Sequence, residues 1–165
     1  MREFSAEPIH LSLTELNSKQ SKVAEKIFRK ILRFMGDRAH SKYSPKFLAA
    51  EILEKGWQSK WLREEIFSQL MKQLTNNPNK SSKEKGWQLM ALCLETFPPD
   101  LQFENYLEMF LRSYKYPGAR EHSVRERAKL KSVTTSDFVR RRSKTTALGD
   151  GNHPNALRRD PSVGW

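Results

Sequence analysis

The sequence predicts an all-α fold, a compact helical bundle of about five to six helices with a disordered basic C-terminal tail. Three observations predict it. Apolar residues recur every three or four positions between Ser18 and Tyr114, which is the period of a helix. Turn residues (Gly, Pro and Asn) break this pattern at short intervals, and no stretch alternates as a strand does. After Ser132, Ser, Thr, Arg, Gly, Asn and Pro dominate, which is typical of disorder.

A first helix is predicted from Ser18 to Met35, because its apolar residues follow one side and its basic residues mark the other. Gly36 ends it, as glycine commonly does at a helix C-terminus. Residues 1–17 are expected to form a lead-in segment. Its spaced apolar residues are expected to pack across the helices: Ile9, Leu11, Leu13 and Leu16.

A second helix is predicted to begin at Ser44 and Pro45, with the serine as cap and the proline in the first turn, and to run to Gly56. The third is predicted from about Ser59 to Leu74. Its core residues are spaced by four positions: Leu62, Ile66, Leu70 and Leu74.

A fourth helix is predicted to begin with a capping box formed by Ser81 and Glu84. From Trp87 to Phe97 it is apolar nearly all round, which favours a place at the centre of the bundle. A fifth helix is predicted to start at Asp100 and to end near Tyr114. Its apolar residues lie on one side: Phe103, Tyr106, Leu107, Phe110 and Leu111.

These patterns predict a helical domain over residues 1–117, a terminal polar helix as an option for 118–131, and a disordered basic tail over 132–165. The charge distribution agrees with this division. Residues 1–111 hold 17 Lys and Arg against 14 Asp and Glu, a net charge of +3. Residues 112–165 hold 13 against 5, a net charge of +8, so most of the total of +11 lies outside the predicted core.

Composition argues against several classes of protein. A single cysteine, Cys93, cannot form an internal disulfide, and it lies in the most apolar helix, where an inert buried thiol is expected. No apolar run is long enough to span a bilayer, and the N-terminus lacks a secretory leader, so we expect a cytoplasmic protein. The four histidines are scattered, and no phosphate-binding glycine loop is present. We therefore expect neither an enzyme nor a cofactor.

The most distinctive block of the sequence is residues 62–78, LREEIFSQLMKQLTNNP. It is followed by Gly86-Trp87, Phe97-Pro98-Pro99 and Tyr106-Leu107, and it is preceded by Glu7-Pro8-Ile9 and by the helix end at 34–37. In this order, over roughly residues 5–115, the blocks resemble the MyTH4 (myosin tail homology 4) domain. Most of the shared residues sit beside core positions or element boundaries and are expected to determine the fold: Leu62, Arg63, Glu65, Gln69, Lys72, Gln73, Asn77, Pro78, Gly86, Trp87, Pro98 and Pro99.

The resemblance implies a helical bundle that binds other proteins. MyTH4 domains occur in tails of unconventional myosins, in a plant kinesin-like protein, in PH/MyTH4/FERM proteins and ahead of a RhoGAP domain. They bind microtubules or adaptor peptides, commonly together with a FERM domain. The expected function is therefore a non-catalytic, cytoskeleton-associated interaction module whose partner is an acidic surface such as tubulin, or an adaptor peptide.

Two alternatives remain open. The domain can be a structural module that packs against a neighbouring FERM or RhoGAP domain in a larger motor or signalling protein. Trp57 and Trp61 are candidates for such an interface, although their positions favour a role as caps of the core. The basic tail can also bind nucleic acid weakly and without sequence preference, whereas the absence of a recognition-helix signature argues against specific binding.

The candidate binding residues are basic. The resemblance implies a first candidate site, because microtubule-binding MyTH4 domains carry basic residues on the helix with the Tyr-Leu pair. The matching positions in this sequence are Asn105, Glu108 and Arg112, of which only Arg112 is basic. The first helix offers a substitute basic face; the alternative interpretation is that this face is only a solvated surface. Its residues are Lys22, Lys26, Arg29, Lys30 and Arg33, together with Lys19. The tail holds a second basic cluster, formed by Arg140, Arg141, Arg142 and Lys144 around the candidate phosphosite Ser143. Alternatively, this cluster only keeps the protein soluble.

Overall fold

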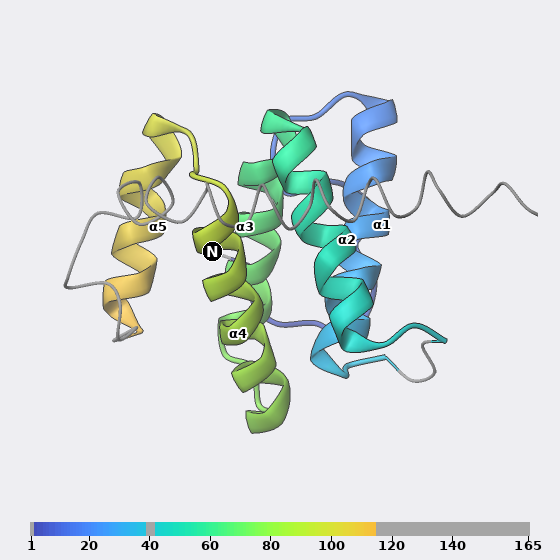
Figure 1. Cartoon of the computed structure of the whole chain (residues 1–165). Coiled ribbons are helices and arrows are strands. Elements are labelled where there is room, and N and C mark those ends of the chain that lie inside the picture. The colour runs from blue at the N-terminus through green and yellow to red at the C-terminus, as the bar shows by residue number, and fades with distance from the viewer. Residues whose placement is uncertain (1, 39–41, 115–165) are drawn as a thin grey trace, which may run out of the picture.

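The computed structural model describes residues 2–38 and 42–114, and within them all regular structure is helical (Figure 1). This confirms the all-α prediction. The predicted polar helix at 118–131 and the predicted tail lie outside the described residues. The helices are α1 (Ser18–Met35), α2 (Pro45–Gln58), α3 (Lys60–Leu74), α4 (Lys80–Thr96) and α5 (Leu101–Ser113). None of these helices is both long and apolar enough to cross a lipid bilayer.

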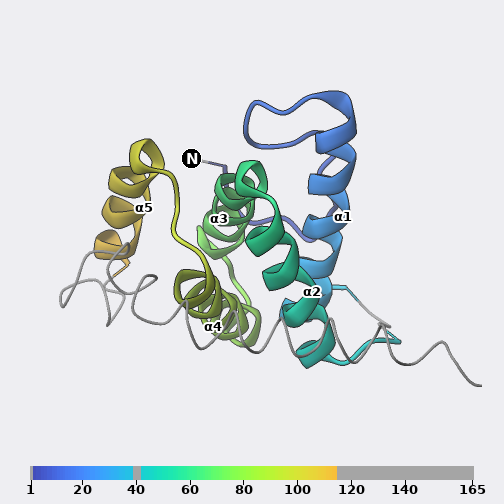
Figure 2. The same ribbon diagram turned by 45° about the horizontal axis from the view of Figure 1, so that its top comes forward.

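Helix α3 is the centre of the bundle. It packs against each of the other four helices, and α1 and α5 lie at opposite edges in both views (Figures 1 and 2). Its residues Leu62, Ile66, Leu70 and Leu74 are all completely buried, as their spacing predicts. The sequence pattern favoured α4 for the central position, but that interpretation is wrong: Leu92 of α4 is 37% exposed, because one side of α4 faces solvent.

Side-chain caps define where the helices begin. Ser44 caps α2 by accepting a hydrogen bond from the amide of Phe47, and Asp100 caps α5, both as predicted. The predicted capping box of α4 is wrong, because Asn79 accepts from the amide of Ser82 at 3.1 Å and the helix already begins at Lys80. At the C-terminus of α1, Gly36 adopts the left-handed conformation with φ 87°, as a helix-ending glycine does.

The lead-in segment runs beside α3 and is held there by polar side chains of that helix. Lys72 Nζ donates to the carbonyl of Glu3 at 2.6 Å. Gln73 pairs with both backbone groups of Ser5, donating to its carbonyl at 2.9 Å and accepting from its amide at 3.1 Å. The Phe4 amide donates to the carbonyl of Thr75 at 3.0 Å. The start of the chain therefore lies along the C-terminal half of α3.

Glu65 holds the other end of the lead-in segment. Its fully buried carboxylate accepts from the amides of Leu13 at 3.0 Å and Thr14 at 2.8 Å, and from the Thr14 hydroxyl at 2.6 Å. A fourth donor, Gln69 Nε2, lies at 2.7 Å. A buried carboxylate is costly unless donors surround it, and these four provide that environment.

The lead-in segment contributes fewer apolar contacts than its sequence indicates. Ile9 packs against Phe28 and Leu32 of α1, and Leu13 lies partly buried against the same group. Leu11 is 72% exposed, so its predicted packing is wrong. The chain bends at residues 10 and 11, between the two anchored ends, and this bend turns Leu11 towards solvent.

Gly56 lies where any larger residue would clash with a buried aromatic ring. A Cβ atom at this position would lie 2.3 Å from Cε1 of Phe97, which is itself fully buried. Gly56→Ala should therefore destabilise the fold by about 1–3 kcal/mol through overpacking, although alanine is the better helix former. Urea unfolding with an unchanged m-value measures this change.

The matched control for Gly56 relieves the clash from the other side. In a Phe97→Leu background the smaller side chain leaves room for the added methyl group. There Gly56→Ala should cost clearly less than in the wild type, since the two positions touch and their effects are not additive. Equal costs in both backgrounds would show that the Gly56–Phe97 contact is not the cause.

Glu65 generates the second prediction. Glu65→Ala leaves the partly buried amides of Leu13 and Thr14 without an acceptor, so we expect a loss of about 2–4 kcal/mol in the free energy of unfolding. Hydrogen exchange should show loss of protection at those two amides before global unfolding. The control is Glu84→Ala, at an exposed glutamate of α4, which should change stability by less than about 0.5 kcal/mol. Unchanged protection at Leu13 and Thr14 would refute the anchoring role.

Candidate interaction surfaces

The basic residues of α1 form one exposed face of that helix. Residues three, four and seven positions apart share a face of a helix, and the apolar residues of α1 are buried on the opposite side. We define the α1 basic face as the five exposed cations Lys19, Lys22, Lys26, Arg29 and Arg33. The sixth predicted member, Lys30, is only partly exposed and pairs with Glu51 of α2 at 2.9 Å, so it ties two helices together.

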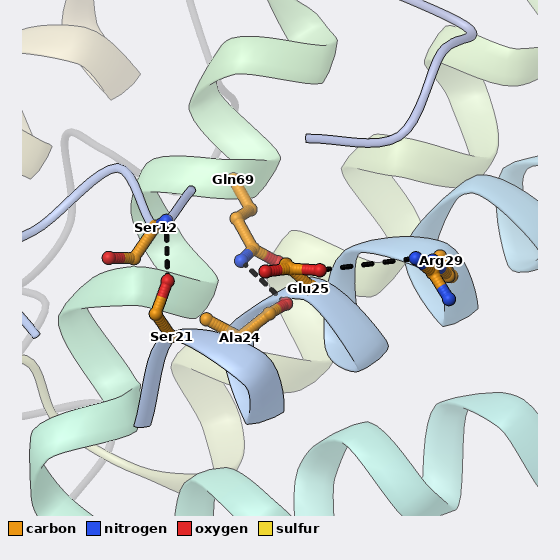
Figure 3. Close-up of polar contacts among 6 residues, drawn as sticks. All are labelled: Ser12, Ser21, Ala24, Glu25, Arg29 and Gln69. Atoms are coloured by element: carbon orange, nitrogen blue, oxygen red, sulfur yellow. Dashed lines mark hydrogen bonds and ion pairs between the residues drawn. The ribbon is translucent and has the colours of Figure 1, made fainter. Parts of the chain in front are cut away.

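Most of this face keeps its charge available. Arg29 lies 3.9 Å from Glu25 one turn earlier, at the outer limit of an ion pair (Figure 3). An exposed pair of this kind contributes little free energy. The other four members make no ion pair with any described residue. A row of cations along one face of a helix is suited to bind an acidic surface.

The helix that carries this face is anchored from behind. Gln69 Nε2 of α3 donates to the carbonyl of Ala24 at 3.0 Å, and the Ser12 amide of the lead-in segment donates to Ser21 Oγ at 3.1 Å (Figure 3). Ile27, Phe28, Ile31 and Leu32 are buried at 2% exposure or less. The basic face is therefore presented on a helix fixed by packing and by hydrogen bonds.

The basic position on α5 does not join the α1 basic face. Arg112 is exposed and pairs with Glu108 at 3.2 Å, one turn earlier on the same helix. Helix α5 lies at the opposite edge of the bundle from α1 (Figures 1 and 2). Arg112 and the α1 basic face are therefore two separate candidate sites.

Arg63, one of the residues shared with MyTH4 domains, acts between helices. Its guanidinium donates to the carbonyl of Gly56 at 2.9 Å and to that of Trp57 at 3.2 Å, so it closes the C-terminal end of α2. These contacts cannot be predicted from the sequence pattern, because only the tertiary structure brings the Arg63 side chain to the end of the preceding helix. The two tryptophans near Arg63 differ in exposure: Trp57 is half-buried, whereas Trp61 is 37% exposed.

The turn before α4 is a hydrogen-bonded unit built on Asn77. Its Nδ2 donates to the Gln73 carbonyl and to Ser82 Oγ, each at 3.0 Å, and its Oδ1 accepts from the Asn79 amide at 2.9 Å. Ser82 Oγ in turn donates to Asp37 at 2.8 Å. Burial raises the pKa of Asp37, although Ser82 and the charge of Lys85 act in the opposite direction.

The glycine and tryptophan at 86 and 87 have separate structural roles. Gly86 faces Met35 of α1 and Leu74 of α3, which both lie within 3 Å of where a Cβ atom at position 86 would stand. The missing side chain therefore lets α1 and α3 pack closely against α4. Trp87 is half-buried against Phe110 and Tyr114 of the C-terminal helix end. The other shared residues also lie where architecture needs them: Leu62, Glu65, Gln69, Lys72, Gln73 and Pro99 are buried, Pro98 is half-buried and Pro78 is at an exposed turn.

Among the described residues, no group of three His, Cys, Asp or Glu side chains is placed to hold a metal ion. Cys93 is completely buried, and burial raises the pKa of its thiol far above the ordinary range, which makes it a poor nucleophile. The tail cluster at 140–144, including Ser143, lies outside the described residues.

Comparisons with known proteins agree on one family. The MyTH4 domain family matches residues 49–148. The high molecular weight form of myosin-1 from Acanthamoeba castellanii is 46% identical over 111 residues, which is 67% of this chain and 7% of that protein. The kinesin-like protein KIN-14E from Arabidopsis thaliana is 29% identical over 144 residues, 84% of this chain and 11% of that protein. The chain thus spans a small part of these relatives.

A solved structure of the human Myosin 7b C-terminal MyTH4-FERM domain, in complex with the harmonin-a PDZ3 domain, has the same fold. It aligns with a TM-score of 0.63 and 29% sequence identity, over 89% of this chain and 28% of that one. The family match covers more than half of the sequence, and the helical bundle agrees with it. This chain belongs to the MyTH4 domain family.

Proposed function

We propose that this MyTH4 domain is a non-catalytic protein-interaction module that binds an acidic protein surface, such as tubulin, through the α1 basic face. The observation that carries the proposal is the row of five exposed cations on a helix anchored from behind. Its relatives include a myosin and a kinesin-like protein, so we place the protein in the cytoplasm in association with the cytoskeleton.

The electrostatics of the face support such a partner. From Lys19 to Arg33 the cations extend over fourteen residues, or about 21 Å of helix axis. A row of this length can contact several carboxylates of one acidic segment. The attraction between exposed charges is screened over about 10 Å at 0.1 M salt, so binding should weaken steeply as salt is added.

A neighbouring domain or an adaptor is the second candidate partner. Leu101 and Met109 of α5 are 61% and 71% exposed, and Trp61 is also exposed. Exposed apolar residues of this size favour a contact surface for another domain. The solved relatives in which MyTH4 and FERM are combined, and the complex with a PDZ domain, support this alternative. Nucleic-acid binding by the basic tail is the third candidate and would be weak and salt-sensitive.

Charge reversal of the α1 basic face tests the main proposal. The variant Lys22→Glu/Lys26→Glu/Arg29→Glu/Arg33→Glu should lose co-sedimentation with taxol-stabilised microtubules, because repulsion replaces attraction along one side of the helix. Wild-type binding should fall sharply between two salt concentrations. Circular dichroism checks that the variant remains folded.

The matched control changes the net charge equally at exposed basic positions off this face: Arg38→Glu/Lys46→Glu/Lys55→Glu/Lys80→Glu. It should retain most of the binding. If both variants lose binding to the same extent, net charge alone is responsible. If the α1 variant still pellets with microtubules, the face is not the binding site.

Phosphorylation of the tail at Ser143 is expected to act as a switch of binding. Phosphate on Ser143 would place a charge of about −1.5 to −2 among Arg140, Arg141, Arg142 and Lys144 and so weaken binding to an acidic partner. The phosphomimetic Ser143→Asp should lower microtubule affinity and reduce its dependence on salt. Ser162→Asp, outside the cluster, should have no effect. An unchanged salt dependence for Ser143→Asp would exclude the switch.

A further inference from the structure

Helix α3 presents a face towards α5 that the α1 basic face does not involve. Trp61, Glu64, Ser68, Met71 and Lys72 follow one another at helical spacing along it. Two hollows lie along this face, of about 540 and 300 Å³, and both are bounded by Thr14 of the lead-in segment and by residues of α5 or its cap. Because both hollows are lined by Thr14, we refer to the two together as the trough between α3, α5 and the lead-in segment.

One end of the trough is acidic. Its larger hollow is lined by the carboxylates of Glu15, Glu64 and Asp100, with Lys60 as the one cation among the lining residues and the exposed Trp61 as a wall. None of the three carboxylates makes an ion pair with another described residue. Burial raises the pKa of Glu64, and the Asp100 charge raises it further. A cation entering this end would relieve that repulsion.

The other end is cationic with apolar walls. Its hollow is lined by Arg2 and Lys72 together with Leu13, Met71, Phe103 and Tyr106, and no carboxylate is among the lining residues. Lys72 Nζ donates to a backbone carbonyl rather than to an acid. Burial lowers the pKa of Lys72, and the Arg2 charge lowers it further. An anion is the group that this end lacks.

The trough therefore fits an extended peptide with charges of opposite sign at its ends. Along α3, the residues that line the two hollows run from Lys60 to Lys72, twelve residues or about 18 Å of helix axis. An extended chain covers that distance in about five to six residues. The complementary sequence has a cation, then a small apolar pair, then a carboxylate.

We propose that this trough binds residues 144–150 of the same chain, with Lys144 at the acidic end, Ala147 and Leu148 on the apolar walls, and Asp150 at the cationic end. The sequence KTTALGD has the required order and spacing. The arginines at 140–142 precede it and add positive charge on the side that meets Glu15, Glu64 and Asp100. Charge complementarity at both ends fixes the direction in which the segment lies.

The length of the chain permits this return. Between Tyr114 and Lys144 lie residues 115–143, and an extended chain of that length spans up to about 100 Å. Helix α5, along which the chain must come back, is 13 residues long, or about 20 Å. The MyTH4 match runs to residue 148, well past the end of α5, so most of the proposed ligand belongs to the matched region.

A spin label on the full chain tests the proposal. Since Cys93 is buried, the added thiol of Thr146→Cys can be labelled selectively with a nitroxide in the folded protein. The label should reduce the NMR amide signals of Ser68, Phe103 and Tyr106 at least twofold relative to a reduced, diamagnetic sample. Signals of Arg29 and Arg33, in the half of α1 that is farther from the lining residues Glu15 and Leu16, should not change.

Charge swaps identify the occupant. In the labelled chain, Lys144→Glu/Asp150→Lys keeps the net charge but reverses both ends, and it should remove the effect at the trough. Adding Glu64→Lys to that variant should restore part of it. Persistence of the effect in the swapped variant would overturn the proposal, as would its absence in the parent labelled chain.

A second segment and a second molecule are the competing occupants. Residues 131–137, KSVTTSD, have the same spacing of Lys and Asp, but Val133 stands in place of an apolar pair and no run of three arginines precedes them. If Lys131→Glu/Asp137→Lys removes the effect and the swap at 144 and 150 does not, residues 131–137 are the ligand and the proposal is wrong. Mixing labelled unenriched chain with unlabelled ¹⁵N chain detects contacts between molecules, and an effect of full size there would also overturn it.

Discussion

The buried carboxylate of Glu65 is the interaction that the arrangement of this domain depends on most. It accepts hydrogen bonds from the backbone of the lead-in segment and from Gln69, and Gln69 in turn bonds the backbone of α1. One side chain on the central helix thus joins three parts of the chain that are distant in sequence. A buried acid tolerates no loss of its donors, so each partner is held in a single place.

This arrangement explains why residues shared across the family carry architecture rather than ligand contacts. Along α3, the polar residues Glu65, Gln69, Lys72 and Gln73 bind backbone groups of the lead-in segment or of α1, while Arg63 closes α2. Polar side chains inside a bundle must be satisfied, and backbone groups are the partners available there. The binding chemistry is left to the outer surfaces.

Those outer surfaces are formed by different elements, the basic face by α1 and the trough by α3, α5 and the lead-in segment. The α1 basic face has one sign of charge and is suited to an extended acidic partner. The trough between α3 and α5 combines both signs with apolar walls, so it favours a short segment of defined sequence. In the two proposals made above, the α1 basic face attracts an acidic partner over a long range, while the trough holds residues 144–150 of the same chain.

Much of the fold follows from sequence pattern alone. The helical period places Leu62, Ile66, Leu70 and Leu74 in the core, because residues spaced by four share one face of a helix. The helix ends at Gly36 and Ser44 can also be predicted, because capping depends only on residues within one or two turns. Where two local signals compete, sequence is less decisive, and Asn79 rather than Ser81 begins α4.

The sequence by itself determined the fold class, the order of the helices, the family and the basic character of α1. Only the tertiary structure decided which helix lies at the centre, that Glu65 and Arg63 bond distant backbone, and that Lys30 is held by Glu51 of another helix. It also separated Arg112 from α1 and brought Arg2, Lys72, Glu64 and Asp100 to one trough. The physical reason is range: periodicity and capping act between residues a few positions apart, whereas burial, pairing and charge complementarity depend on contacts that exist only after the helices have packed.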